Sequence, residues 1–167
     1  SFLNAVLDFK DEKMIKDVDI LNSYQLPKIK ELKETILDIR ATNQNNEKFI
    51  VEMQRKDLGD FDKRSEYYVA KTYVEQLDKG KSYSTLKKVY FIGIVNFKIF
   101  GNEHYVSRHW TVNKETGIQE LDGVEFAFIE LPKFKKKLNE LKTITDKWVY
   151  FIKNARNMDM IPKNLKI

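Results

Sequence analysis

The sequence predicts an α/β fold, in which antiparallel strands are followed by a helix and then by another strand. Two short apolar runs, residues 35–41 and 49–54, flank the polar stretch 42–48 and have the lengths of the two strands of a hairpin. Residues 61–77 carry apolar side chains at helical spacing. Residues 89–100 form the most apolar stretch and are rich in β-branched and aromatic residues, which is typical of a buried central strand. Because a helix that follows an antiparallel hairpin must cover one face of it, these segments predict a layered α/β core.

Further elements are predicted on either side of this core. Residues 1–9 have apolar residues at helical spacing and predict the end of a first helix, and residues 18–21 predict a short strand. Two more strands are expected over residues 104–112 and 124–131, separated by turn-forming residues. Residues 133–156 are expected to be helical.

Each strand of the hairpin carries one carboxylate within an otherwise apolar run. A hairpin centred on Asn45 pairs residue 38 with residue 52, so Asp38 and Glu52 lie opposite each other on one face. Like charges in this position are destabilising, and a shared divalent cation is the commonest reason for them. The alternative is that both are ordinary carboxylates on an exposed sheet face.

Composition limits the kinds of protein that this chain can be. With 167 residues, of which 42% are hydrophobic, the chain is long enough for one compact domain over residues 1–167. It has no cysteine, so a metal site must use oxygen or histidine ligands. No apolar run approaches the roughly 20 residues that span a bilayer, so we expect a soluble, cytoplasmic protein without a membrane partner. The chain begins at Ser1 inside a helical pattern, so we expect an incomplete N-terminus.

A net charge of +5 is compatible with a polyanionic partner. The densest basic cluster contains Lys133, Lys135, Lys136 and Lys137 and is predicted to open a surface helix. Lysines at a helix start oppose the macrodipole, which favours a phosphate-facing role. A solvated helix face is the alternative.

The residues around the two carboxylates resemble a known family. The runs ILDIRA, with Asp38, and FIVEMQ, with Glu52 and Gln54, are similar to the PD-(D/E)XK nuclease superfamily, and to its branch of recombination-promoting nucleases and transposases. Further matching segments, in order, are Phe2 to Leu7, Lys63-Arg64-Ser65 with Tyr68, Gly80, Tyr83, Leu86, Glu130-Leu131-Pro132-Lys133-Phe134, and Trp148 with Phe151. The resemblance implies a restriction-endonuclease-like core of helix, antiparallel hairpin strands, helix and strand, with extra strands and a C-terminal helix.

The resemblance also implies a metal site. Asp38, Glu52 and the backbone carbonyl of Met53 are expected to bind Mg²⁺ or Mn²⁺, which prefer oxygen ligands. Gln54 stands where the superfamily has lysine, although the branch itself has glutamine there. A neutral glutamine can only form hydrogen bonds, so we expect slower or conditional chemistry, with Gln54 positioning the attacking water. Arg64, from the following helix, is expected to supply the positive charge that is missing.

Arg64 and Tyr68 are four residues apart and therefore lie on one helix face. The alternatives are a surface ion pair for Arg64 and ordinary core packing for Tyr68. Lys56 is a weaker candidate for the cation, on the face of Glu52 and Gln54 if their strand continues. The residues expected to contact DNA are Lys56, Tyr68, Lys133, Lys135 and Lys136.

These features predict a metal-dependent DNA endonuclease that hydrolyses phosphodiesters and resembles the nucleases associated with transposition and DNA recombination. The competing class is a catalytically weak or inactive DNA-binding or protein-interaction module that retains the nuclease fold. The sequence leaves open whether the chain acts as a homodimer.

Overall fold

The computed structural model describes residues 1–21, 24–25, 35–36 and 38–155. The helices are α1 Phe2–Leu7, α2 Phe61–Val74 and α3 Ile144–Asn154. The strands are β1 Val18–Leu21, β2 Tyr24–Gln25, β3 Thr35–Ile36, β4 Ile39–Asn43, β5 Lys48–Gln54, β6 Val89–Val95, β7 Val106–Trp110 and β8 Val124–Glu130. Single 3₁₀ turns are formed by Asp11–Lys13, Tyr83–Thr85, Leu131–Lys133 and Leu138–Glu140.

Six of the strands form one sheet in the order β1-β4-β5-β6-β8-β7, and β2 pairs with β3 separately. The β1–β4, β4–β5 and β7–β8 pairs are antiparallel, whereas β5–β6 and β6–β8 are parallel. A parallel pair needs a crossover connection, and α2 makes it between β5 and β6. The order of helix, hairpin, helix and strand that the sequence predicts is therefore confirmed.

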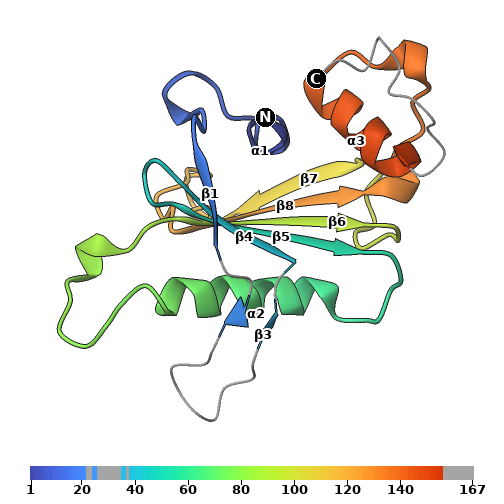
Figure 1. The fold of residues 1–167 in the computed structure, drawn as a ribbon. Helices are drawn as coiled ribbons and strands as arrows, with labels where there is room; N and C mark the ends of the chain where they lie inside the picture. Colours follow the sequence, from blue (N-terminus) through green and yellow to red (C-terminus); the bar gives the residue numbers. More distant parts are fainter. Residues whose placement is uncertain (22–23, 26–34, 37, 156–167) are drawn as a thin grey trace.

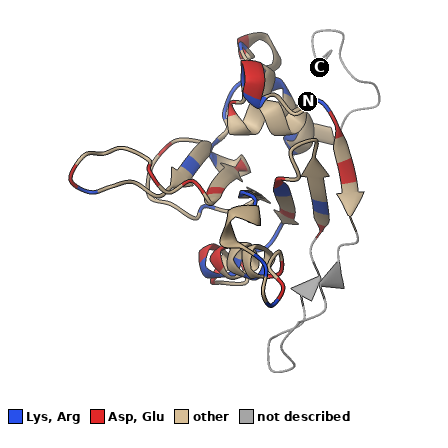
Figure 2. Cartoon of the chain, turned by 90° about the vertical axis from the view of Figure 1, so that its left-hand side faces the viewer, with Lys and Arg blue, Asp and Glu red and all other residues tan. Residues whose placement is uncertain are grey.

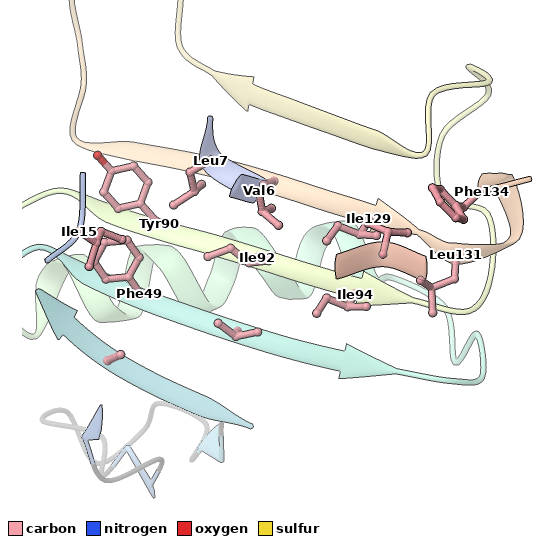
Figure 3. Packing of buried hydrophobic residues seen from close by; sticks show 14 residues of the cluster. Val6, Leu7, Ile15, Phe49, Tyr90, Ile92, Ile94, Ile129, Leu131 and Phe134 are labelled. Atoms are coloured by element: carbon pink, nitrogen blue, oxygen red, sulfur yellow. The ribbon is translucent and has the colours of Figure 1, made fainter. Parts of the chain in front are cut away.

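Helices cover both faces of the sheet, with α2 on one face and α1 and α3 on the other (Figure 1). The core beneath α1 and α3 includes Val6, Leu7 and Val149 packed on inward-facing residues of β5, β6 and β8 (Figure 3). The core beneath α2 includes Phe61 and Val69. Because both faces of the central strand are covered, all seven residues of β6 are buried, as the apolar run 89–100 predicts for its first part.

The hairpin has the predicted register. Ile39 pairs with Val51 and Thr42 with Lys48, which is the alignment centred on Asn45. The turn closes with hydrogen bonds between Asn43 and Glu47, and Asn46 adopts a left-handed backbone with φ 61°. Since register decides which face each side chain occupies, this alignment also determines which residues of the two strands face each other at the end of the hairpin away from the turn.

Two of the predicted strands are longer than the strands in the structure, so these predictions were wrong in their bounds. The run 35–41 is divided between β3 and β4, because the Asp38 N–H donates to the Glu52 side chain instead of a backbone carbonyl (2.9 Å). The run 89–100 leaves the sheet after Val95, because the N–H groups of Ile99 and Phe100 donate to the buried carboxylate of Glu130 (2.6 and 3.2 Å). The other elements between residues 1 and 131 end within three residues of their predicted limits, a normal scatter.

The predicted helix over residues 133–156 was also wrong in its first half. Within residues 133–155, the part of this range that the structure describes, only Ile144–Asn154 is α-helical. This helix begins at a capping box in which Thr143 and Asp146 exchange hydrogen bonds. Residues 131–133 and 138–140 form single 3₁₀ turns, with extended backbone at Phe134 and Lys137. The lysine cluster therefore lies in an irregular segment rather than at the start of a surface helix.

Gly93, in the middle of β6, lets α2 approach the sheet closely. A Cβ atom added there would lie 2.8 Å from a ring carbon of Phe61 and 3.0 Å from one of Phe128. Phe61 is the first residue of α2 and is 5% exposed. The absence of a side chain at position 93 therefore sets how deeply the start of α2 is seated.

We expect Gly93→Ala to lower the free energy of unfolding by about 1–3 kcal/mol, because overpacking forces neighbouring rings to move. Gly101→Ala is the matched control, since an added Cβ at Gly101 meets nothing within 4 Å. Urea unfolding of both variants measures the difference. An equal stability of the two variants would show that the ring packing above Gly93 is not tight.

Candidate metal and phosphate site

The two carboxylates of the hairpin lie together beside the end of β5. Asp38 forms a bend directly before β4, and Glu52 belongs to β5. The Asp38 N–H donates to Oε1 of Glu52 (2.9 Å), and the Met53 N–H donates to Oδ2 of Asp38 (2.7 Å). Each carboxylate thus binds the backbone of the opposite strand, and these reciprocal bonds hold the two acidic side chains next to each other.

The electrostatics of this pair are unusual for surface carboxylates. Burial raises the pKa of Glu52 from its ordinary value of 4.5 to about 7, and the charge of Asp38 adds to the rise. The hydrogen bond from the Asp38 N–H and the charge of Arg64 act in the opposite direction on this pKa. Burial and the neighbouring carboxylate thus disfavour the charged form of Glu52, and a bound cation would favour it.

The donor set fits a hard divalent cation. Among the described residues, Oδ1 of Asp38 and Oε2 of Glu52 have no hydrogen-bond partner. In the same part of the chain, no group of three or more acidic, histidine or cysteine side chains is placed to share an ion. Two carboxylates with room for further oxygen ligands are what Mg²⁺ commonly uses, because it keeps several waters and takes substrate phosphate oxygens.

The short loop after β5 brings the first turn of α2 back to this site. Gly59, with φ 77°, and Asp60, with φ 54°, both have left-handed backbones and reverse the chain direction. Phe61 then enters the core beneath α2, and Arg64 follows one turn later. The Arg64 guanidinium lies 5.4 Å from the centre of the Phe61 ring, in the geometry of a cation–π contact.

Gln54 and Arg64 are in direct contact. Nη2 of Arg64 donates to Oε1 of Gln54, and Nε2 of Gln54 donates to the carbonyl of Lys56 (2.8 Å). The charge of Arg64 also acts on Glu52. The structure thus brings together Asp38, Glu52, Gln54 and Arg64, four residues that are separated by up to 26 positions in the sequence.

Tyr68 lies one turn further along α2 on the face of Arg64 and is half-buried. Burial raises its pKa, and the charges of Glu52 and Asp38 raise it further, while Arg64 lowers it. The phenol therefore remains neutral at physiological pH and can donate a hydrogen bond. Its place at the edge of the core beneath α2 also fits the packing role that the sequence left open.

The lysines that the sequence predicts to contact DNA differ in whether their side chains are exposed. Lys56 is exposed in the bend after β5, so it does not continue the strand face of Glu52 as expected. Nζ of Lys133 is buried and donates to Oε2 of Glu130 (2.6 Å), so Lys133 cannot reach DNA in this structure. Lys136 pairs with the buried carboxylate of Asp146 (2.6 Å), whereas Lys135 is exposed.

A separate cavity of about 300 Å³ lies between α2 and the strands β7 and β8. Its walls include Phe100, Phe126 and Phe128, and the carboxylates of Asp62 and Glu66 lie at its rim. It includes neither Asp38 nor Glu52, and its acidic rim would repel phosphate. α2 carries both acidic and basic residues (Figure 2), and Arg64 rather than Asp62 or Glu66 lies beside Gln54.

Two features around the site escaped sequence analysis. The ring of Phe61 supports Arg64, and the buried pair Glu130–Lys133 holds the loop after β6. In the sequence, Phe61 is only an aromatic residue at a helix start. Its contact with Arg64 cannot be predicted without knowing how α2 packs on the sheet. Glu130 and Lys133 stand in a segment that resembles the family, but nothing in the sequence indicates that their side chains pair in the core.

None of the helices in the described residues is both long enough and apolar enough to span a bilayer.

A comparison with protein families matched residues 1–166 to the family described as PD-(D/E)XK nuclease family transposase. Comparisons with curated proteins and with solved structures found no match. The family match covers nearly the whole chain and includes the carboxylate hairpin, α2 and the mixed sheet. The chain therefore belongs to the PD-(D/E)XK nuclease family transposases and has their restriction-endonuclease-like α/β fold.

Proposed function

We propose that the chain is a DNA endonuclease that hydrolyses phosphodiesters with Mg²⁺ or Mn²⁺. The observation that carries this proposal is the reciprocal hydrogen bonding of Asp38 and Glu52. The burial of Glu52 and the charge of Asp38 raise the pKa of Glu52 to about 7. The family membership supports nuclease chemistry in general, and the donor set supports the metal.

Asp38, Glu52 and the carbonyl of Met53 would hold the cation. When bound, a divalent cation lowers the pKa of a water ligand and neutralises charge on the phosphate. Arg64 would contact the scissile phosphate, and the action of its charge on the Glu52 carboxylate supports this role. Tyr68, on the same helix face, would donate a hydrogen bond to the DNA backbone. A nearby positive charge stabilises the charge that develops on the phosphate during reaction.

The test is cleavage of a supercoiled plasmid by the purified chain in Mg²⁺, in Mn²⁺ and in EDTA, with Asp38→Ala as the negative control. Metal-dependent nicking by the wild type, absent from Asp38→Ala, is the expected result. If both proteins bind DNA and neither cleaves it, the endonuclease is ruled out and a non-catalytic DNA-binding module takes its place.

We expect DNA binding to weaken steeply with salt and to depend little on sequence. The basic side chains that we expect to make this contact include Arg64 and the exposed lysines Lys56 and Lys135, which would meet phosphates rather than base edges. Each phosphate neutralised releases counterions, so the logarithm of affinity falls linearly with the logarithm of salt concentration. Fluorescence anisotropy in Ca²⁺ between about 50 and 200 mM salt measures the slope. A flat affinity, or binding that follows one sequence only, would contradict this electrostatic model.

A further inference from the structure

The partners of Gln54 define the orientation of its amide group. Arg64 has only N–H donors, so the atom that faces it must be the amide oxygen. The carbonyl of Lys56 is only an acceptor, so the atom that faces it must be the amide nitrogen. Exchanging the two amide atoms would place donor against donor and acceptor against acceptor. The chemistry of its two partners thus determines the orientation of Gln54.

Arg64 has few other constraints on its position. Among the described residues, Gln54 is the only hydrogen-bond acceptor of its guanidinium, and Nε is buried without a partner. The Phe61 ring fixes the distance of the guanidinium from the core but supplies no directional hydrogen bond. The direction in which the guanidinium points is therefore set by Gln54.

We propose that Gln54 is a positioning residue that holds Arg64 beside the carboxylate pair. This inference rests on the proposed function in that Arg64 contacts the phosphate, and it gives Gln54 a different role from the water-positioning one expected from sequence. A lysine at position 54 cannot accept the Arg64 hydrogen bond and would place a second cation against the first. Glutamine at position 54 and arginine at position 64 are thus one arrangement, in which the cation comes from the helix instead of the strand.

The alternative is that the second N–H of the Gln54 amide binds the attacking water directly. In that case positions 54 and 64 act independently, and their substitutions have additive effects on the free energy of activation. If Gln54 acts through Arg64, the effects of the two substitutions are coupled. A substitution of Gln54 already displaces the Arg64 guanidinium, so removing that guanidinium as well has a smaller further effect.

The first experiment needs neither DNA nor metal. The guanidinium ¹⁵Nη resonances of Arg64 are expected to be individually resolved in the wild type at low temperature, because the bond to Gln54 slows rotation. In Gln54→Met, which has similar length and no amide, they should merge. In Gln54→Glu, which keeps an acceptor, they should remain resolved. Arg108, whose Nε donates to the Val6 carbonyl (2.7 Å), is the internal control. Unchanged Arg64 resonances in Gln54→Met would overturn the proposal.

The second experiment measures the rate of single-turnover DNA cleavage. Arg64→Gln is expected to slow cleavage by about 100-fold, which is typical for loss of one transition-state donor, and Gln54→Lys should also slow it. The double variant Gln54→Lys/Arg64→Gln should be faster than Gln54→Lys alone, because it moves the cation to the strand and removes the repulsion. Lys63→Gln, next to Arg64 but exposed and paired with Asp60, controls for lost charge. A Gln54→Lys rate at or above that of wild type, or strictly additive effects, would overturn the proposal. If the wild type does not cleave DNA, the proposed function fails, while the resonance experiment still decides whether Gln54 holds Arg64.

Discussion

Glu52→Gln is expected to slow metal-dependent DNA cleavage by more than about 100-fold and to make the metal-free protein more stable. The loss of activity follows because a cation site with two carboxylates loses one of them, and metal catalysis supplies several kcal/mol of transition-state stabilisation, with a factor of ten for each 1.4 kcal/mol. The gain in stability follows because the substitution removes a half-buried negative charge that lies next to the charge of Asp38. The two effects have opposite signs, so unfolding cannot explain the loss of cleavage.

The pH dependence gives this prediction a defined window. The folded-state pKa of Glu52 is about 7 and its ordinary value is 4.5, so between these values the native state binds more protons than the unfolded state. The free energy of unfolding of the metal-free wild type therefore falls as pH rises from about 4.5 to about 7. At about 1.4 kcal/mol per pH unit the contribution is at most about 3.5 kcal/mol, and partial exposure of Glu52 makes it smaller. Glu52→Gln should lack this fall.

Urea unfolding in EDTA between pH 4.5 and 8, together with plasmid cleavage in Mg²⁺, measures both effects. Glu66→Gln is the matched control, because Glu66 is exposed on α2 at the rim of the separate cavity. Full cleavage by Glu52→Gln would exclude Glu52 as a metal ligand. A parallel pH profile for Glu52→Gln and wild type would show that the apposed charges do not affect stability.

The carboxylate pair could be predicted from sequence because it depends on local rules. Alternation of side chains and a short polar turn determine which residues of a hairpin face each other, so Asp38 and Glu52 are brought together before any long-range contact is known. The same kind of rule predicts the buried strand and the amphipathic helix, since periodicity and apolar content describe burial in a sheet and on a helix face.

The contact between Gln54 and Arg64 could not be predicted in this way. It depends on how deeply α2 is seated, which is set by the space above Gly93 and by the packing of Phe61 there. That depth is a property of two elements separated by a loop and a further turn, and no sequence period encodes it. The sequence indicates only that Arg64 lies on a helix near the hairpin.

The lysine cluster shows a second limit of prediction from sequence. Lys133 is a buried partner of Glu130 and Lys136 pairs with Asp146, so two of the four cluster lysines neutralise acids within the fold. Composition counts them as basic surface, because it carries no information on which charges are satisfied internally. The segment between β8 and α3 contains no α-helix, and at the start of α3 four hydrogen bonds, one of them from Lys136, converge on one carboxylate.

That carboxylate, Asp146, gives the largest expected effect on stability. Its side chain is fully buried and accepts hydrogen bonds from Nζ of Lys136 (2.6 Å), from the Tyr105 hydroxyl and from two backbone N–H groups that precede α3. Burial alone would raise the pKa of Asp146, but these four bonds outweigh it and hold the pKa well below its usual range. Asp146→Asn replaces an acceptor oxygen by an NH₂ group that faces donors.

We expect Asp146→Asn to lower the free energy of unfolding at pH 7 by about 3 kcal/mol, the range found when one partner of a buried charged network is removed. Because the folded-state pKa is depressed, the stabilisation is present above the unfolded-state pKa near 4 and is lost as pH falls below it. The difference between wild type and Asp146→Asn should therefore shrink below about pH 4. Urea unfolding between pH 2.5 and 7 measures it, with Asp62→Asn, an exposed first-turn acid of α2, as the control. A difference that stays constant down to pH 2.5 would show that packing around residue 146, and not its charge, stabilises the start of α3.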